Sequence, residues 1–301
     1  QGEWLIEPDR TGLATPLHMT MDSREVHTGM VFLAFRGERI DSHTFVAGVA
    51  ANHATAVVVD RQPDTDTMST LEEYGCGCLL VPDSLKAYQD LGHACRVRSG
   101  ANTNFRLIGI TGSSGKTSTK EIIRQIADRA CPNKVLATEG NTNNLIGVPR
   151  NLLRLTDEHQ MAVIEMGTNA PGEIAALAQI AQPDIAVLTS IGPVHLEGLG
   201  SIEGVATEKA AIFHNLHAHK GWAILPLECA KREQVASCLP SGRTLTVGDT
   251  EEANICVDYQ QGNLLGSTFD VTLKFNRTDL PFSGYSSSHF QVSWSLTGKH
   301  Q

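Results

Sequence analysis

The chain has 301 residues, of which 41% are hydrophobic and 19% charged, the composition of an ordinary globular protein long enough for two domains. Its formal net charge of −9 argues against a nucleic-acid partner, because such partners normally meet a basic surface. No apolar run approaches the ~20 residues that span a bilayer, so membrane insertion is not expected.

The first hundred residues have the pattern of a small α/β domain. Short apolar or β-branched runs predict three strands, at Val31–Phe35, Thr55–Asp60 and Cys78–Val81. Two helices are predicted, at Thr44–Asn52 and from Asp83–Ser84 to about Val97. The polar stretch Ser99–Asn104 has no periodicity and is predicted to be a linker, which places the first domain at residues 1–100.

Strands and helices alternate from Phe105 onward. The strands are predicted at Arg106–Ile110, Met161–Glu165, Asp184–Ser190 and Trp222–Leu225. The helices are predicted at Ser118–Arg129, Gly172–Ala181 and Ser201–Leu216. This alternation predicts a second α/β domain, at residues 105–301, with a mainly parallel sheet covered by helices. Ligands in such a fold collect at the carboxyl ends of the strands.

The end of the chain has a different character. Polar and apolar residues alternate over Val257–Phe275, with turn residues at Gln261–Asn263, which predicts an antiparallel hairpin. The serine-rich segment Phe282–Gln301 has no assigned structure.

Cysteine usage indicates a reducing compartment. The seven cysteines are scattered, and no pair or Cys/His cluster has the spacing of a zinc site. We therefore expect a cytoplasmic protein. The chain starts at Gln1 without a Met or a secretory leader and ends abruptly, so we expect a fragment at both ends.

A glycine-rich turn joins the strand that ends at Ile110 to the helix that follows it. Backbone N–H groups in such a turn, together with the helix N-terminus, bind phosphate oxygens. The strict nucleotide-binding pattern G-x-x-x-x-G-K-[ST] fails, because Ile110 stands at its first glycine. The alternative is an ordinary strand–helix turn with a surface lysine. We expect nucleotide-phosphate binding by Thr111, Gly112, Ser113, Ser114, Gly115, Lys116, Thr117 and Ser118.

Glu165 ends one predicted strand of the same sheet, and His195 lies just past another. Glu165 would be placed to bind Mg²⁺ in front of the phosphate loop, or it is a surface or helix-capping glutamate. His195 could ligate a divalent cation, although most lone histidines are packed or surface residues. The amide-rich segment Asn141–Asn144 suggests contacts with phosphate or substrate, or a simple turn.

The motifs together resemble the Mur ligase family, ATP-dependent enzymes that build the peptide stem of peptidoglycan. The resemblance covers most of residues 20–215. It rests on Thr111–Glu121, Gly140–Pro149, Glu165–Ile174, Pro183–Thr189, His195–Glu197, Lys209 and the N-terminal segments Asp22–Arg24, Phe35–Gly37 and Asp41–His43. It is closest to the branch that joins D-Ala-D-Ala to UDP-MurNAc-tripeptide.

The resemblance implies three domains, of which the third is expected to be absent here because Leu296–His300 looks like the end of the central one. The first domain would bind the UDP-sugar and the central one ATP. Substrate binding would involve Ser23, Arg24, Arg36, Gly37, Asp41 and His43. Asn144 would contact the nucleotide, and the protein would act as a monomer.

The resemblance also implies a site for two Mg²⁺ ions. The metal set would be Thr117, Glu165, His195 and a carbamylated Lys209, and the catalytic residues Lys116, His195 and Lys209. In isolation, a helical lysine such as Lys209 would be taken for a surface group. Carbamylation would require an amine with a pKa well below the usual ~10.4 of lysine.

Several positions differ from the family pattern. They are Ser42 in place of glycine, Ala211 in place of glutamate, Pro226–Leu227 in place of an Asn-Asp turn, and Gln301 in place of asparagine. The adenine contacts are therefore not assigned. The alternatives to the expected ligase are another Mur ligase, a ligase resembling folylpolyglutamate synthase, or an inactive nucleotide-binding paralogue or fragment.

Overall fold

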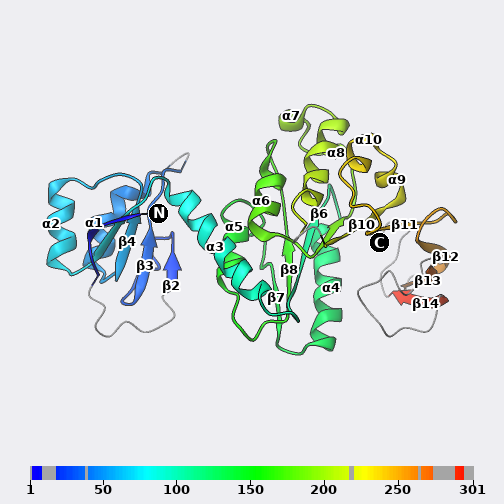
Figure 1. The fold of residues 1–301 in the computed structure, drawn as a ribbon, viewed down its shortest axis with the longest axis horizontal. Coiled ribbons are helices and arrows are strands. Elements are labelled where there is room, and N and C mark those ends of the chain that lie inside the picture. Colours follow the sequence, from blue (N-terminus) through cyan, green and yellow to red (C-terminus); the bar gives the residue numbers. More distant parts are fainter. Residues whose placement is uncertain are drawn as a thin grey trace. The chain divides into compact units, whose positions relative to one another are not determined.

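The computed structural model describes residues 2–8, 18–37, 40–216, 220–263, 266–273 and 289–294. It divides the chain into two compact units, Gln1–Leu91 and Gly92–Gln301 (Figure 1). The division falls inside helix α3 (Ser84–Gly100), which therefore contributes to both units. None of the helices in the described residues is long and apolar enough to cross a bilayer.

The first unit is built on a five-stranded sheet. Its strands are β1 (Glu3–Ile6), β2 (His18–Thr20), β3 (Met30–Leu33), β4 (Ala56–Val59) and β5 (Gly77–Leu80). Its other helical elements are η1 (Ser42–Phe45), α1 (Val46–Ala51) and α2 (Thr65–Glu73). The strand order is β1-β5-β4-β3-β2, with β2 to β5 parallel and β1 antiparallel to β5.

The local sequence explains these elements. All four residues of β4 and of β3 are buried, as expected for strands covered on both faces. Asp64 caps α2 because its carboxylate accepts a hydrogen bond from the Thr67 N–H at 2.8 Å. Leu71 is the one buried residue of α2, whose other residues are mostly polar, and this helix was not predicted.

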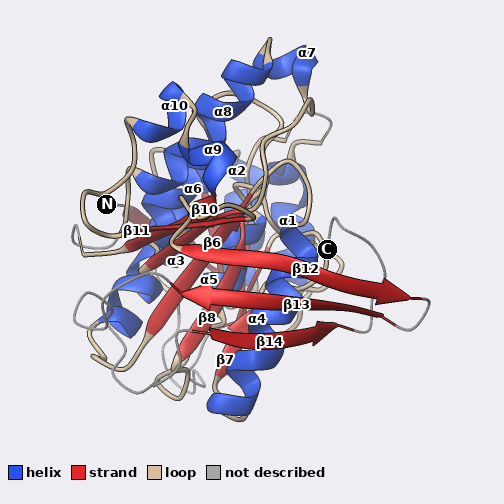
Figure 2. Cartoon of the chain, turned by 90° about the vertical axis from the view of Figure 1, so that its right-hand side faces the viewer, coloured by secondary structure: helices blue, strands red, loops and turns tan. Residues whose placement is uncertain are grey.

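The second unit contains a nine-stranded sheet in the order β14-β13-β12-β11-β10-β9-β6-β8-β7. Its strands are β6 (Arg106–Thr111), β7 (Val135–Ala137), β8 (Met161–Glu165), β9 (Ile185–Leu188), β10 (Trp222–Pro226), β11 (Thr244–Gly248), β12 (Ile255–Asn263), β13 (Gly266–Leu273) and β14 (His289–Trp294). Neighbouring strands from β7 to β12 are parallel, and β12, β13 and β14 are antiparallel (Figure 2).

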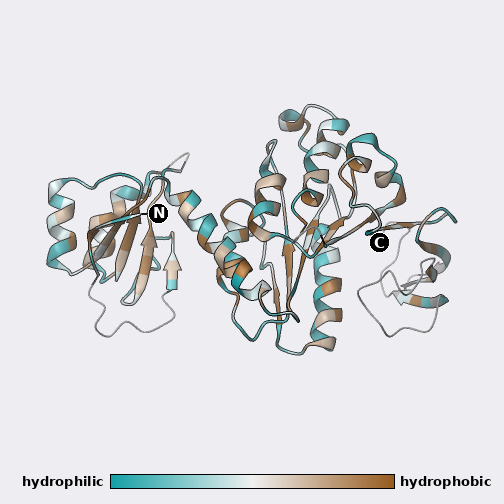
Figure 3. Cartoon of the chain, viewed as in Figure 1, coloured by the Kyte–Doolittle hydropathy of each residue, from teal (hydrophilic) through white to brown (hydrophobic). Residues whose placement is uncertain are grey.

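Helices cover both faces of the parallel part of this sheet. They are α4 (Lys116–Ala130), α5 (Gly147–Leu153), α6 (Glu173–Ala181), α7 (Leu196–Leu199), α8 (Ile202–Ala210), η2 (Ala211–Phe213), α9 (Leu227–Ala230) and α10 (Glu233–Ala236). Leu107 belongs to the larger apolar core with α5, α6 and α8, whereas its neighbour Ile108 packs on the other face with Ile123 of α4. The apolar strands between these helices appear brown in Figure 3.

Most predicted elements of the second unit are present, with specific differences. The predicted turn Gln261–Asn263 lies inside β12, which continues to Asn263. The predicted helix Ser201–Leu216 consists of α8 followed by η2. Ser99 and Gly100 lie in α3 rather than in a linker. Of the unassigned C-terminal segment, the structure describes only residues 289–294, as β14. The last two residues of the predicted hairpin, 274 and 275, and the segment Leu296–His300 lie outside the described residues.

A buried arginine fixes the second half of α3 within the second unit. The Arg96 side chain is 1% exposed and donates hydrogen bonds to the carbonyls of Ala181 and Gln182. It also pairs with the Asp184 carboxylate at 3.0 Å, and its guanidinium lies 5.4 Å from the Phe105 ring centroid. Asp184 in turn accepts a hydrogen bond from the Leu107 N–H, at the start of β6. Arg96 therefore ties α3 to the base of the central strands.

We predict that Arg96→Met lowers the free energy of unfolding of the second unit by about 3 kcal/mol, because it leaves buried carbonyls without a donor. Urea unfolding followed by circular dichroism measures the change. Arg98→Met is the matched control, since Arg98 lies two residues away with 61% of its side chain exposed. Equal effects of the two substitutions would contradict the prediction.

Candidate functional site

The predicted phosphate loop connects β6 to α4 at the carboxyl end of a central strand. Thr111 ends β6, and Lys116 is the first residue of α4. Gly112 and Gly115 have φ angles of +153° and +80°, which side-chain-bearing residues rarely adopt. The first amides of α4 lack intrahelical partners and are available to an anion. The Lys116 ammonium donates a hydrogen bond to the Gly112 carbonyl at 2.8 Å, which places its charge over the loop.

The loop is held in place by the segment that follows β9. The Ser113 N–H donates to the Ser190 carbonyl at 2.9 Å, and the Ser114 N–H donates to the Ser190 hydroxyl at 2.9 Å. A Cβ atom on Gly112 would lie 1.9 Å from the Thr189 hydroxyl oxygen. The loop and this segment therefore pack backbone against backbone, and a glycine is required between them.

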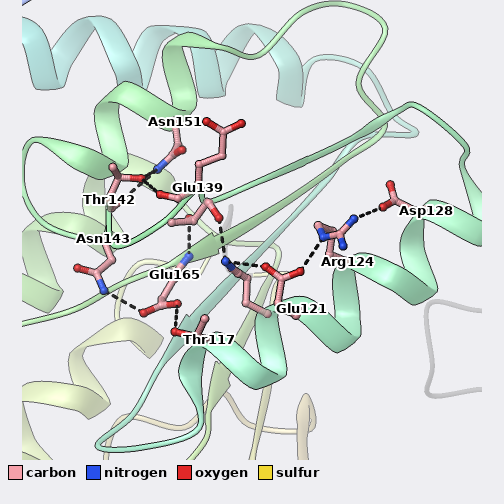
Figure 4. Close-up of polar contacts among 11 residues, drawn as sticks. Thr117, Glu121, Arg124, Asp128, Glu139, Thr142, Asn143, Asn151 and Glu165 are labelled. Carbon is pink, nitrogen blue, oxygen red and sulfur yellow. Dashed lines mark hydrogen bonds and ion pairs between the residues drawn. The ribbon is translucent and has the colours of Figure 1, made fainter.

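Glu165, at the end of β8, meets the loop directly. Its Oε2 accepts a hydrogen bond from the Thr117 hydroxyl at 2.9 Å, and its Oε1 accepts one from the Asn143 amide at 2.9 Å. Figure 4 shows the carboxylate between these two side chains. β6 and β8 are adjacent and parallel, so their carboxyl ends meet at one edge of the sheet. The structure thus brings together Thr117 and Glu165 of the predicted metal set.

These residues fit a divalent cation. Glu165 is 2% exposed, and within the described residues no lysine, arginine or histidine pairs with it. A buried carboxylate without a counter-charge is costly unless a cation neutralises it. Carboxylate and hydroxyl oxygens are the ligand atoms that Mg²⁺ prefers. The Thr111 hydroxyl is also buried at the loop without a hydrogen-bond partner.

Lys209, on α8, is buried rather than exposed as an isolated helical lysine would be. Its side chain is 1% exposed, and its ammonium has no hydrogen-bond or ion-pair partner among the described residues. Burial and, to a smaller extent, the nearby positive charge of Lys116 lower the pKa of Lys209 to about 8, against the opposing effect of Glu208. The effect of Lys116 places Lys209 in electrostatic reach of the phosphate loop.

Glu208 forms no ion pair with Lys209, because its carboxylate is hydrogen-bonded elsewhere. It accepts hydrogen bonds from the backbone N–H groups of Gly172 and Ile174 at 2.6 and 2.8 Å, and from the Thr168 hydroxyl at 3.2 Å. These contacts attach α8 to the N-terminal end of α6. Lys209 is therefore held on a rigid helix whose adjacent carboxylate points elsewhere.

Two predicted residues, His195 and Asn144, make no hydrogen bond with Thr117, Glu165 or Lys209 in the described part of the chain. His195 is exposed, with a φ of +52° at the start of α7, and its imidazole makes no hydrogen bond in the described residues. Its predicted contact with the metal stays a prediction. The Asn144 side-chain oxygen accepts hydrogen bonds from the N–H groups of Ile146 and Gly147, so it caps the approach to α5. Only the Asn144 amide N–H₂ group remains for a nucleotide.

Within the described residues, no group of three or more His, Cys, Asp or Glu side chains is arranged so that it could hold a metal ion. The predicted metal set is of another kind, because it relies on the Thr117 hydroxyl and on a modified Lys209.

In the first unit, Asp41 and His43 come together at the carboxyl ends of β3 and β4. The buried His43 ring lies between two carboxylates, with Nδ1 2.9 Å from Asp41 and Nε2 3.0 Å from Asp60. Arg61 also pairs with Asp41, at 2.5 Å. Burial raises the pKa of Asp41, but the hydrogen bonds from His43 and Arg61 outweigh it and bring the pKa to about 2.

The other predicted substrate residues precede Asp41 in the sequence; they are Ser23, Arg24, Arg36 and Gly37. Arg24 is exposed and makes a two-point contact with Asp22, and this hydrogen bonding lowers the pKa of Asp22 to about 2. Ser23 lies in the same turn. The backbones of Arg36 and Asp41 form a β-bridge, and the Gly37 N–H donates to the Ile40 carbonyl.

Two of the departures from the family pattern have visible roles. The Ser42 hydroxyl is buried and closes the loop by hydrogen bonds with both the N–H and the carbonyl of Phe35 at 2.8 Å. Pro226 ends β10, and Leu227 starts α9 directly after it.

Sequence reasoning missed three contributors to these sites. Asn143 holds Glu165, yet only its neighbour Asn144 was singled out from the amide-rich segment. Asp60 and Arg61 complete the first-unit cluster. Their position immediately after a buried parallel strand is the signal that could have identified them.

We predict that Gly112→Ala abolishes nucleotide binding or weakens it at least about tenfold, because the new Cβ collides with Thr189 and the φ of +153° is strained. Isothermal titration with ADP measures this. Gly192→Ala is the control on the neighbouring segment, where a Cβ meets only the Ser113 side chain at 3.8 Å. Unchanged affinity in Gly112→Ala would show that the loop does not bind the phosphates.

Known proteins resemble this chain over both units. Residues 110–301 match the family model of the Mur ligase middle domain. UDP-N-acetylmuramoyl-tripeptide–D-alanyl-D-alanine ligase of Escherichia coli is 41% identical over 198 residues, 66% of this chain and 40% of the relative. The Bacillus subtilis enzyme of the same name is 37% identical over 203 residues, 67% of this chain and 42% of the relative. The chain thus spans less than half the length of these relatives.

Solved structures agree with the sequence comparison. A crystal structure of MurF from Acinetobacter baumannii superposes with a TM-score of 0.77 at 31% identity, covering 94% of this chain and 56% of that one. MurF from Thermotoga maritima in complex with ADP gives 0.72 at 28% identity, covering 92% and 57%. With the family model matching well over half of its residues, the chain belongs to the Mur ligase family.

Proposed function

We propose that this protein is an ATP-dependent amide ligase of peptidoglycan synthesis that joins D-Ala-D-Ala to UDP-MurNAc-tripeptide. The observation that carries the proposal is the buried Glu165 carboxylate, hydrogen-bonded to Thr117 of a glycine-rich phosphate loop. Support comes from relatives that bear this enzyme name and from a structural neighbour bound to ADP. The N-terminal segments that resemble the Mur ligase family are expected to bind the UDP-sugar of the acid substrate.

The loop supplies the groups that ATP requires. The backbone amides of the turn and of the start of α4 bind the phosphate oxygens, and Lys116 contributes a positive charge. Thr117 and Glu165 would hold Mg²⁺, which offsets the negative charge of the triphosphate and of the acid substrate. Lys209, when carbamylated, and His195 would complete a second magnesium site.

The reaction is an activation followed by a transfer. A carboxylate oxygen of the tripeptide attacks the γ-phosphorus of ATP, the bond from that phosphorus to the bridging oxygen breaks, and ADP leaves. The amine nitrogen of D-Ala-D-Ala then attacks the carbonyl carbon of the acyl phosphate. The bond from that carbon to the phosphate oxygen breaks, phosphate leaves and the amine loses a proton. Residues of the loop stabilise the first step because two anions must approach each other.

Carbamylation gives Lys209 a role suited to a cationic site. The neutral amine nitrogen attacks the carbon of CO₂, an N–C bond forms, one C–O π bond opens and an amine proton is released. The product carries a negative charge and two oxygens. The Lys209 amine is buried without a partner among the described residues and has a pKa of about 8, and both properties favour carbamylation.

In the first unit, the cluster of Asp41, His43, Asp60 and Arg61 would bind the UDP portion of the acid substrate. A cavity of about 400 Å³ adjoins it and is lined in part by Asp60, Arg61 and Gln62. We propose that the protein acts as a monomer in the cytoplasm, where its seven free cysteines would stay reduced.

The proposal predicts phosphate release from ATP that depends on both UDP-MurNAc-tripeptide and D-Ala-D-Ala. Glu165→Gln should lower kcat by about a hundredfold or more, because an uncharged amide cannot neutralise the metal. A coupled phosphate assay measures both effects. Glu158→Gln, at an exposed position before β8, is the control.

A panel of other acids and amino-acid acceptors separates the alternatives. Turnover with another stem precursor or with folate and glutamate would assign the protein to a different ligase of the superfamily. Nucleotide binding without turnover of any pair would identify an inactive paralogue.

Carbamylation predicts a pH-dependent signal that can be measured without turnover. Because the pKa of Lys209 is lowered to about 8, the neutral amine grows from about a tenth at pH 7 to about half at pH 8. NMR with ¹³C-bicarbonate should therefore show a carbamate resonance that rises over this range and is lost in Lys209→Arg. Lys231→Arg, at an exposed lysine, should keep it. A resonance that survives Lys209→Arg would contradict the assignment.

A further inference from the structure

We propose that Lys120 is a positioning residue for the magnesium site. Its ammonium holds the end of β7 in place, so that Thr138 and Asn143 keep the Glu165 carboxylate turned toward Thr117. This inference rests on the proposed role of Thr117 and Glu165 in holding the metal. Lys120 and Glu121 end the motif Thr111–Glu121 on which the family resemblance rests, but they have no part in the reaction described above.

Lys120 is placed unusually for a lysine near a helix start. It lies on α4 three residues after Thr117, and its side chain is 3% exposed. Lysine is almost never fully buried unless it is paired. The ammonium donates to the Thr138 carbonyl at 2.9 Å and pairs with Glu121 Oε1 at 2.9 Å. α4 is thus attached to the chain just beyond β7 through a buried charge-assisted hydrogen bond.

Thr138 continues the link to Glu165. It is 2% exposed, and its N–H donates to the Val163 carbonyl at 3.0 Å. Its hydroxyl accepts a hydrogen bond from the backbone N–H of Glu165 at 2.9 Å. The carbonyl of this residue therefore faces Lys120, and its hydroxyl holds the backbone of Glu165.

The loop that starts at Thr138 provides the second contact on Glu165. Thr142 Oγ1 donates to the Glu139 carbonyl at 2.7 Å, and the Asn151 amide donates to the Thr142 carbonyl at 2.9 Å. The loop then reaches Asn143, whose carbonyl accepts from the Gly167 N–H and whose amide donates to Glu165. Both the backbone and the carboxylate of Glu165 are thus held by one segment, which Lys120 anchors. Figure 4 shows Asn143 and Thr142 of this segment beside Glu165.

The surroundings explain why a lysine is needed for this anchor. A cavity of about 440 Å³ lies between α4 and the end of β7, and charged or polar residues such as Arg124, Glu139 and Arg154 line part of it. Apolar packing therefore does not close this gap. The long side chain of Lys120 reaches the Thr138 carbonyl with a strong donor at its end.

A purely structural tie would affect stability but not metal binding, and the two roles can be separated. Residues that orient metal ligands typically alter metal affinity by about 10- to 100-fold when substituted. The experiment titrates the protein with ADP by calorimetry, once with excess Mg²⁺ and once with EDTA. The ratio of the two affinities is the magnesium-dependent gain. Mn²⁺ binding in the presence of ADP, followed by electron paramagnetic resonance, reports the metal directly.

We expect Lys120→Met to lower the magnesium-dependent gain about tenfold while the affinity in EDTA changes less than twofold. Arg124→Met is the matched control, because Arg124 lies one turn further along α4 and also contacts Glu121, but is more exposed and does not reach Thr138. It should leave the gain unchanged. A Lys120→Met protein with a lower Tm and an unchanged gain would overturn the inference.

Thr138, which joins Lys120 to Glu165, provides a second test if Lys120→Met does not fold. Thr138→Val removes the hydroxyl that holds Glu165 and should lower the gain, whereas Thr138→Ser should retain it. Equal gains in these two variants would overturn the inference. If the unsubstituted protein shows no magnesium-dependent gain, the proposed metal site itself fails, a result distinct from failure of Lys120 alone.

Discussion

The contact between Thr117 and Glu165 is the interaction on which the candidate site depends. It joins the first turn of α4 to the end of β8, two elements that are 48 residues apart in sequence. The contact exists because β6 and β8 are neighbours in a parallel sheet, so the residues that follow them emerge at the same edge. The fold therefore creates a place where a buried carboxylate faces a phosphate loop.

Two buried charges near this contact, Glu165 and Lys209, have no ion-pair partner among the described residues. The hydrogen-bond donors that the structure describes for the buried Glu165 carboxylate are uncharged, and no carboxylate of the described residues forms an ion pair with the buried Lys209. Glu208, the acid next to Lys209, is used to hold the start of α6. Unbalanced buried charges reduce stability, so their presence at one edge of the sheet favours a function that supplies the missing partners.

Much of this arrangement could be predicted from sequence, for identifiable reasons. β8 was predicted at its observed bounds, because four consecutive apolar residues are followed by a single acid. The glycine-rich loop was predicted because a buried strand, glycines, a lysine and a following helix occur there in order. α2 and β7 were missed because α2 has one buried residue and β7 has three residues in all. A mostly polar segment such as α2 does not stand out from a loop, and the three residues of β7 are too few to show periodicity.

The parts of the site that were missed depend on three-dimensional contacts that leave no local pattern. Asn143 and Asn144 are adjacent and chemically identical, yet one holds Glu165 and the other caps a helix. Lys209 looks like any helical lysine until its burial is known. The roles of both residues follow from packing between segments far apart in the chain, which the sequence of either segment does not contain.

The position of the unit boundary inside α3 has a practical consequence for dissecting the protein. A shortened chain that starts at residue 105, after the polar stretch, would discard His93 and Arg96. These side chains contact the carbonyls of Ile180, Ala181 and Gln182 at the end of α6. The second unit would then lose part of its own interior, so a cut that preserves it must fall upstream, before Gly92.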